Sequence, residues 1–158
     1  LIANAALGQS GLTSRVGKRV RDTEGLSYAI NTRFIWTDEV DGAWGVIAAV
    51  APPNAAKAIR STREVVETYV RDGITPEEVE SQKSFFAGNF QVRLGTNAGV
   101  ATQLTYAEKF GFGAKYLDEY PARFRAVTRE QVNQAIRNHF HPDKMVLVVA
   151  GDHPEVPR

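Results

Sequence analysis

The sequence predicts an α+β fold in which several helices pack on one face of a mainly antiparallel sheet. Hydrophobic residues alternate with a period of two between residues 27 and 51, and they recur at helical spacing before and after that segment. A further apolar run at residues 144–150 is typical of a buried strand. The 158 residues, 43% of them hydrophobic, are enough to bury a substantial core, so we expect residues 1–158 to form a single domain.

The chain is expected to begin with two short helical segments. Residues 1–11 have the pattern of a helix that ends in a loop punctuated by glycines. Leu12, Val16 and Val20 then recur every four residues and predict an apolar stripe on a short helix. Gly25 follows the basic last turn of this helix and is a typical helix stop.

The two strands that follow are predicted to form an antiparallel hairpin. In the first strand Tyr28, Ile30 and Thr32 alternate with their neighbours, and residues 43–51 form a second apolar strand. Asp41-Gly42 is a turn signal, so the connecting loop is expected around residues 38–42.

From residue 54 the chain is predicted to be helical almost to residue 142. Gly73 and Gly95 end two of the helices, and a short helix containing residues 116–120 is expected to end before Pro121. Capping-box sequences begin two helices, at Thr75-Pro76-Glu77-Glu78 and at Thr128-Arg129-Glu130-Gln131.

Three strands are few for so many helices, and we expect strands that precede Leu1 to complete the sheet. The only methionine is Met145, so Leu1 is not a translation start and the sequence is expected to be a piece of a longer protein.

Composition excludes several functional classes. Nineteen Lys and Arg residues against eighteen Asp and Glu leave a net charge of +1, which steers no ligand strongly, and no nucleic-acid partner is expected. The chain has no cysteine, which removes disulfides, thiolate metal sites and a cysteine nucleophile. No apolar run approaches the roughly 20 residues of a membrane span. The sequence does not indicate the cellular location of the protein, and the bacterial periplasm and the cytoplasm are both open.

The histidines do not form a recognisable metal motif. His139 and His141 lie near a helix end and before a proline, His153 stands alone, and neither HExxH nor HxxEH occurs. We therefore expect no metal site and no cofactor in this chain.

Arg21 and Tyr28 are the candidate site residues. A turn between them would let both side chains reach the same pocket, where a guanidinium and a phenol can hold a peptide carbonyl or the oxyanion formed from it. The residues alone leave another interpretation open, in which Arg21 pairs with a local carboxylate and Tyr28 is half-buried.

A family resemblance begins at these residues. Gly8-Gln9-Ser10-Gly11-Leu12-Thr13-Ser14-Arg15-Val16, followed by Arg21-Asp22-Thr23-Glu24-Gly25-Leu26-Ser27-Tyr28, resembles the non-catalytic C-terminal half-domain of the pitrilysin/insulinase family of zinc metallopeptidases. There a GGGxSSRL loop precedes an RExxGLAYxV segment; Gln9 and Ser10 stand where the first glycines are usual. Residues 73–79, 126–132 and 145–151 resemble the family's GVTxEEL, xVTxEDV and LxxVVVG segments.

The resemblance implies one half of a clamshell around a peptide substrate. The other half, in the same polypeptide or a separate subunit, would bring HxxEH and zinc, while Arg21 and Tyr28 would bind the carbonyl near the scissile bond. This chain alone would be inactive. The alternative is a structural relative that serves subunit assembly, as in the core subunits of respiratory complex III. The presence of both Arg21 and Tyr28 favours the peptidase.

The first prediction concerns self-association. If the hairpin at 27–51 or the run at 144–150 lacks a neighbouring strand, an unpaired edge or apolar surface remains exposed. We expect the 158-residue chain to self-associate at high concentration in light scattering; a clean monomer would contradict the proposed truncation of the sheet.

Overall fold

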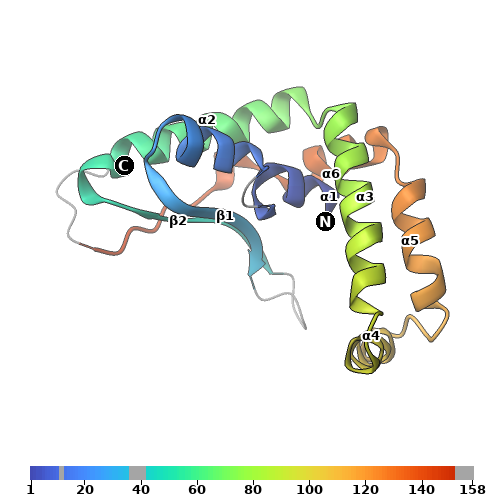
Figure 1. Ribbon diagram of the computed structural model, residues 1–158. Helices are drawn as coiled ribbons and strands as arrows, with labels where there is room; N and C mark the ends of the chain where they lie inside the picture. Colours follow the sequence, from blue (N-terminus) through green and yellow to red (C-terminus); the bar gives the residue numbers. More distant parts are fainter. Residues whose placement is uncertain (11–12, 36–41, 152–158) are drawn as a thin grey trace. The chain divides into compact units, whose positions relative to one another are not determined.

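A computed structural model describes residues 1–10, 13–35 and 42–151 of the chain (Figure 1). The chain divides into two compact units. Unit 1 combines residues 1–74 with the segment that begins at Val132, and unit 2 is formed by Thr75–Gln131.

Unit 1 contains the hairpin and the helical segments that pack on it. Its elements are α1 (Ile2–Asn4), η1 (Ala5–Gln9), η2 (Gly17–Thr23), β1 (Ser27–Ile35), β2 (Ala43–Val50), η3 (Pro52–Asn54), α2 (Ala55–Asp72), the end of α6 (Arg129–His139) and η4 (Pro142–Lys144). Segments η1 and η2 both pack against β1, and η2 also contacts α2, so helices cover one face of the hairpin (Figure 1). The predicted α+β class is confirmed.

The N-terminal segment α1–η1 is part of the core of unit 1. Every residue from Ile2 to Gly8 is buried. The segment approaches β1 so closely that a Cβ atom on Gly8 would overlap with the Thr32 side chain. Thr32 Oγ1 donates a hydrogen bond to the Asn4 carbonyl (3.2 Å), and Trp44 Nε1 donates to Asn4 Oδ1 (2.7 Å). The absence of a side chain at Gly8 therefore permits close contact between the N-terminal segment and β1. Hydrogen bonds from Thr32 on β1 and Trp44 on β2 hold the segment in place.

Tyr69 on α2 joins the distant segments of unit 1. Its ring is fully buried, its hydroxyl donates to the Ala3 carbonyl (3.1 Å), and the edge of Phe140 meets it at 6.3 Å between centroids. The Arg15 guanidinium lies over the same ring at 4.5 Å and donates to the Gly73 carbonyl (3.0 Å). Arg15 thus contributes to the core of unit 1.

The strands pair as an antiparallel hairpin, as predicted, with Ile30 opposite Ala48 and Phe34 opposite Trp44. The predicted loop lies mostly outside the described residues, as does Leu12. Val16 and Val20 of the predicted stripe are completely buried.

The predicted strand at residues 144–150 is wrong. In the part of the chain that the structure describes, β1 and β2 are the only strands. Lys144 ends the short helix η4, and residues 145–150 have no regular secondary structure. Val146 and Val148 are 86% and 84% exposed. An apolar run becomes a strand only when a neighbouring strand takes up its backbone hydrogen bonds.

Unit 2 consists of α3 (Pro76–Arg93), α4 (Asn97–Lys109), α5 (Tyr116–Ala126) and the first residues of α6. Both capping boxes are confirmed. Glu78 N–H donates to Thr75 Oγ1 (3.2 Å) while Thr75 N–H donates to Glu78 Oε2 (2.9 Å), and Thr128 and Gln131 exchange the same two bonds.

The helix expected to end before Pro121 continues to Ala126. Aromatic packing on α3 holds it on both sides of the proline: Tyr120 stacks on Phe90 at 4.1 Å between centroids, and Phe124 packs on Phe86 at 4.8 Å. These contacts offset the single backbone hydrogen bond that a proline removes. Burial raises the pKa of Tyr116, which adjoins this row of rings, to about 12.

The second prediction tests the close contact at Gly8. Gly8→Ala forces a methyl group into the buried Thr32 side chain and should lower the free energy of unfolding by about 1–3 kcal/mol. Gly88→Ala is the matched control: its new Cβ atom meets nothing within 4 Å, and alanine favours a helix by up to about 1 kcal/mol. Urea denaturation compares the two, and equal effects of both substitutions would refute the contact.

Candidate functional site

Arg21 is placed by a wide helical turn and the glycine that ends it. It lies in the last turn of η2, where Leu26 N–H donates to the Val20 carbonyl (2.9 Å) and Gly25 N–H donates to the Arg21 carbonyl (3.1 Å). Gly25 has φ 63°, a conformation that favours glycine, and the chain reverses there into β1. The turn predicted between the two candidate residues is therefore present.

Tyr28 is placed by a β-bulge. Ser27 faces Val50 and Ala29 faces Ala49, so Tyr28 is the additional residue between two successive pairs. The Ser27 hydroxyl lies within hydrogen-bonding distance of the Ala29 and Ala49 carbonyls, at 2.9 and 2.8 Å, and holds the bulge.

The bulge decides which way Tyr28 faces. Regular alternation would put it on the same face as Ile30 and Thr32, which are buried at 4% and 1% exposure. The extra residue changes the phase, and the Tyr28 side chain is 96% exposed. A phenol on a rigid strand is thus presented to solvent at the edge of the turn.

The Arg21 guanidinium is held by its neighbour Asp22. Its Nε and Nη2 atoms lie 2.7 and 3.1 Å from the two Asp22 carboxylate oxygens. The hydrogen bond that the Arg21 guanidinium donates to Asp22 raises the pKa of Arg21, and a smaller electrostatic contribution from Tyr28 acts in the same direction. The alternative interpretation holds for Arg21, which has a local carboxylate partner, and fails for Tyr28, which is not half-buried.

Glu24, within the turn, is a positioning residue that the sequence did not reveal. Its side chain is 10% exposed, accepts a hydrogen bond from Ser61 Oγ of α2 (2.7 Å), and pairs with Arg19. Lys57 Nζ lies 4.0 Å from the same carboxylate. The Ser61 hydrogen bond, followed by Arg19, lowers the pKa of Glu24. These contacts, the Glu24 clasp, attach the turn between Arg21 and Tyr28 to α2.

Among the described residues, His139 and His141 belong to no group that could hold a metal ion. His139 and His141 are exposed, and His153 lies outside the described residues. Among residues 1–10, 13–35 and 42–151, no group of three or more His, Cys, Asp or Glu side chains could hold a metal ion. Over the same residues, no helix has the length and apolar character needed to cross a membrane.

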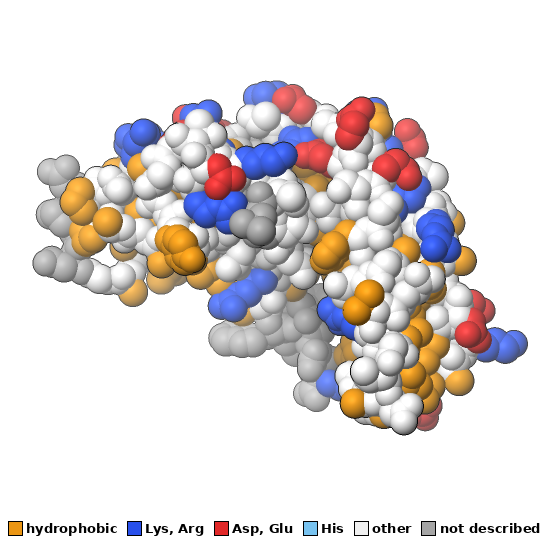
Figure 2. All heavy atoms as spheres, viewed as in Figure 1, with side chains coloured by type: hydrophobic (Ala, Val, Ile, Leu, Met, Phe, Trp, Pro, Cys, Tyr) orange, Lys and Arg blue, Asp and Glu red, His pale blue; other side chains and the backbone are white. Residues whose placement is uncertain are grey.

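Charged side chains of both signs lie on the face of the molecule that Figure 2 shows. Figure 2 shows Lys and Arg side chains beside Asp and Glu over much of the visible face.

Comparison with known proteins identifies the family to which this chain belongs. The sequence pattern described as the peptidase M16 inactive domain matches residues 2–86. The chain therefore belongs to the peptidase M16 family, as its inactive domain, and the resemblance to the non-catalytic half-domain of pitrilysin/insulinase-type metallopeptidases is confirmed.

Relatives and solved structures agree with this assignment. An uncharacterized zinc protease of Mycobacterium tuberculosis is 32% identical over 154 residues, which is 96% of this chain and 34% of that protein. The uncharacterized zinc protease YmxG of Bacillus subtilis is 25% identical over 95% of this chain and 36% of its own. The crystal structure of a peptidase M16 inactive domain from Pseudomonas fluorescens superimposes with a TM-score of 0.80 at 24% identity, over 90% of this chain and 34% of that one. The chain thus spans about a third of the length of its curated relatives.

The third prediction follows from the lowered pKa of Glu24. Because the folded pKa lies below the ordinary value of 4.5, ionised Glu24 stabilises the fold fully above that pH, and this stabilisation is lost as the pH falls through the folded pKa. Glu24→Gln should therefore lower the urea midpoint at neutral pH, and the difference from the wild type should shrink in acid.

The control for this prediction is Glu64→Gln, which removes a carboxylate 3.5 Å from Arg19 that is 63% exposed. Exposed ion pairs contribute little to stability, so its midpoint should change little at any pH. If the difference in urea midpoint between Glu24→Gln and the wild type did not change with pH, the charge of Glu24 would not be what holds the turn.

Proposed function

We propose that this chain is the substrate-binding half of a zinc-dependent metalloendopeptidase, and that residues 1–158 act as a single domain in it. The zinc and its HxxEH motif would lie in a partner half outside this chain, on the same polypeptide or on a separate subunit. The family, and relatives that are named zinc proteases and are about three times as long, support this proposal.

The observation that carries the proposal is the exposure of Tyr28 at the start of β1, the strand that follows Arg21 and its turn. A tyrosine on a half-buried hairpin is normally packed by its ring, yet here a bulge presents it to solvent. Assembly alone gives no reason for a strand to interrupt its own pairing at this position. The bidentate contact with Asp22 holds the planar guanidinium in one orientation, and the Glu24 clasp fixes the turn that separates the two donors.

The proposed role of the two residues is to bind the carbonyl oxygen of the scissile peptide bond. The Tyr28 hydroxyl and the Arg21 guanidinium both donate hydrogen bonds, and each interaction strengthens as negative charge develops on that oxygen. The described residues of this chain include no group that could hold zinc. We expect the isolated chain to be inactive for the same reason.

The fourth prediction tests these two donors in the assembled enzyme. Tyr28→Phe removes only a hydroxyl, and Arg21→Lys keeps the charge but loses the planar fork. Each variant should assemble with the zinc-bearing half, retain its metal, and lose about 10²–10³ in kcat/KM, which is the usual effect of one lost oxyanion donor. Steady-state kinetics on a peptide substrate, with metal analysis, measures both effects.

Tyr106→Phe provides the control, because it removes a hydroxyl from another exposed tyrosine, in α4 of unit 2. Its kcat/KM should stay close to that of the wild type. If Tyr28→Phe and Arg21→Lys are also nearly unchanged, the pair has a structural role only, and the role in subunit assembly becomes the better explanation.

A further inference from the structure

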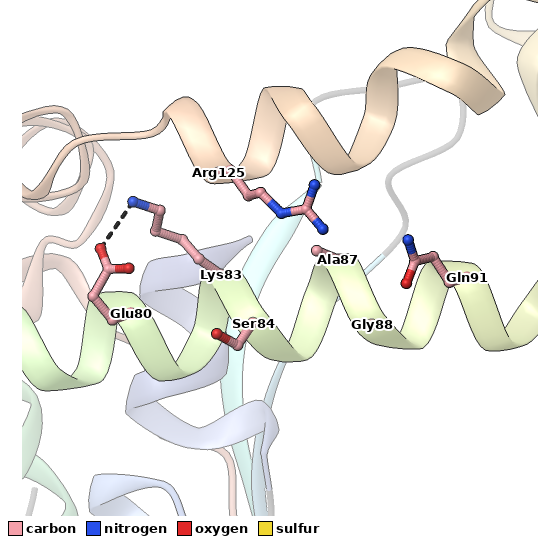
Figure 3. A pocket seen from close by; sticks show the side chains of 7 residues that line it. All are labelled: Glu80, Lys83, Ser84, Ala87, Gly88, Gln91 and Arg125. Atoms are coloured by element: carbon pink, nitrogen blue, oxygen red, sulfur yellow. Dashed lines mark hydrogen bonds and ion pairs between the residues drawn. The ribbon is translucent and has the colours of Figure 1, made fainter.

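A polar groove lies between α3 and α5 in unit 2 (Figure 3). It has a volume of about 460 Å³. Its lining consists of Glu80, Lys83, Ser84, Ala87, Gly88, Gln91 and Arg125. The site proposed above uses none of these residues.

Two cationic side chains, Lys83 and Arg125, line the groove, and only Lys83 is paired with a carboxylate of the described residues. The Lys83 ammonium is 2.8 Å from Glu80 Oε1, one turn earlier on α3, and its side chain is only 15% exposed. Arg125 extends from α5 toward Ala87 and Gly88 (Figure 3) and makes no hydrogen bond or ion pair with any other described residue. The guanidinium thus offers its hydrogen-bond donors to the groove.

The floor of the groove leaves room beneath this guanidinium. Ala87 carries only a methyl group and Gly88 has no side chain, and a Cβ atom added at Gly88 would meet nothing within 4 Å. The Ser84 hydroxyl and the Gln91 amide on the same helix add further hydrogen-bonding groups to the lining (Figure 3).

We propose that this groove binds a carboxylate group of a peptide. Lys83 and Arg125 against Glu80 leave one net positive charge in the lining, which matches a monoanion, while Glu80 opposes a dianion such as phosphate. A planar carboxylate also matches the fork of Arg125 in two parallel hydrogen bonds. The carboxylate preference rests on the groove itself; the choice of a peptide as its carrier rests on the proposed function.

The carboxylate has two possible sources in a peptide, an acidic side chain and the C-terminus. Three Gly-Ser peptides with acetylated N-termini separate them: one has a central Glu and an amidated C-terminus, one has a central Gln and a free C-terminus, and one has Gln and an amidated C-terminus. Backbone amide NMR shifts in the full-length protein report binding without requiring hydrolysis.

The expected result is that a carboxylate peptide shifts the amides around residues 84–91 and 125, and that the peptide without a carboxylate does not. The peptide that binds more tightly identifies the source. Inorganic phosphate, the fourth probe, should bind more weakly than that peptide. Equal binding of the uncharged peptide, tighter binding of phosphate, or shifts absent from this region would overturn the proposal.

Two variants test the groove residues, and a third serves as their control. Arg125→Met should weaken carboxylate binding about tenfold or more, as expected for the loss of a charged hydrogen-bonding partner. Gly88→Leu keeps every charge but fills the open space and should also weaken binding. Arg123→Met is the matched control, because Arg123 on the same helix pairs with Glu119 and does not line the groove.

The outcomes separate this proposal from the proposed function. Equal losses for Arg123→Met and Arg125→Met would show unspecific charge attraction and refute the groove. Carboxylate binding that persists when Tyr28→Phe has no kinetic effect would leave the groove in place and remove the peptidase role.

Discussion

One additional residue in β1 determines both the core of unit 1 and its candidate site. Because Ser27 holds the bulge against Ala49, the strand can turn Ile30 and Thr32 inward while Tyr28 faces solvent. Without the bulge, either Tyr28 would be buried or Thr32 would lose its contact with the Asn4 carbonyl. The same distortion that interrupts the pairing thus lets one strand both pack the core and present Tyr28 to solvent, and it weakens the hydrogen-bond ladder locally.

The stability of the site depends on contacts that are distant in sequence. Arg21 and Tyr28 lie on opposite sides of a tight turn, and the turn is attached to α2 by Glu24 and Ser61. Helix α2 is in turn joined through Tyr69 to the N-terminal segment and to Phe140. The candidate donors are therefore positioned by the whole of unit 1 rather than by the hairpin alone.

Features that depend on neighbouring residues could be predicted from the sequence, and features that depend on distant ones could not. The capping boxes, the hairpin and the stop at Gly25 are local, so residue type and spacing were sufficient. Residues 145–150 have the composition of a strand, but strand formation also needs a pairing partner, which composition does not specify. Packing against α3 extends α5 through Pro121 against its local preference.

The candidate site shows the same division. The turn between Arg21 and Tyr28 was predictable from Gly25. The exposure of Tyr28 depends on the bulge at Ser27, and the alternation of residue types does not reveal where a bulge shifts the strand register. The Glu24 clasp left no signal, because Ser61 lies 37 residues further along the chain.

The division of unit 1 into two stretches of sequence has a consequence for its synthesis. Val132, Ile136 and Phe140 belong to its core, yet they leave the ribosome only after the whole of unit 2 has been made. Until then the Tyr69 face of α2 lacks Phe140, one of its packing partners. Early folding of the helices of unit 2 would shorten the effective loop between residues 74 and 132 and so reduce the entropy lost when that loop closes. Folding of the inserted helices during translation would thus make it easier for the two stretches of unit 1 to pack together.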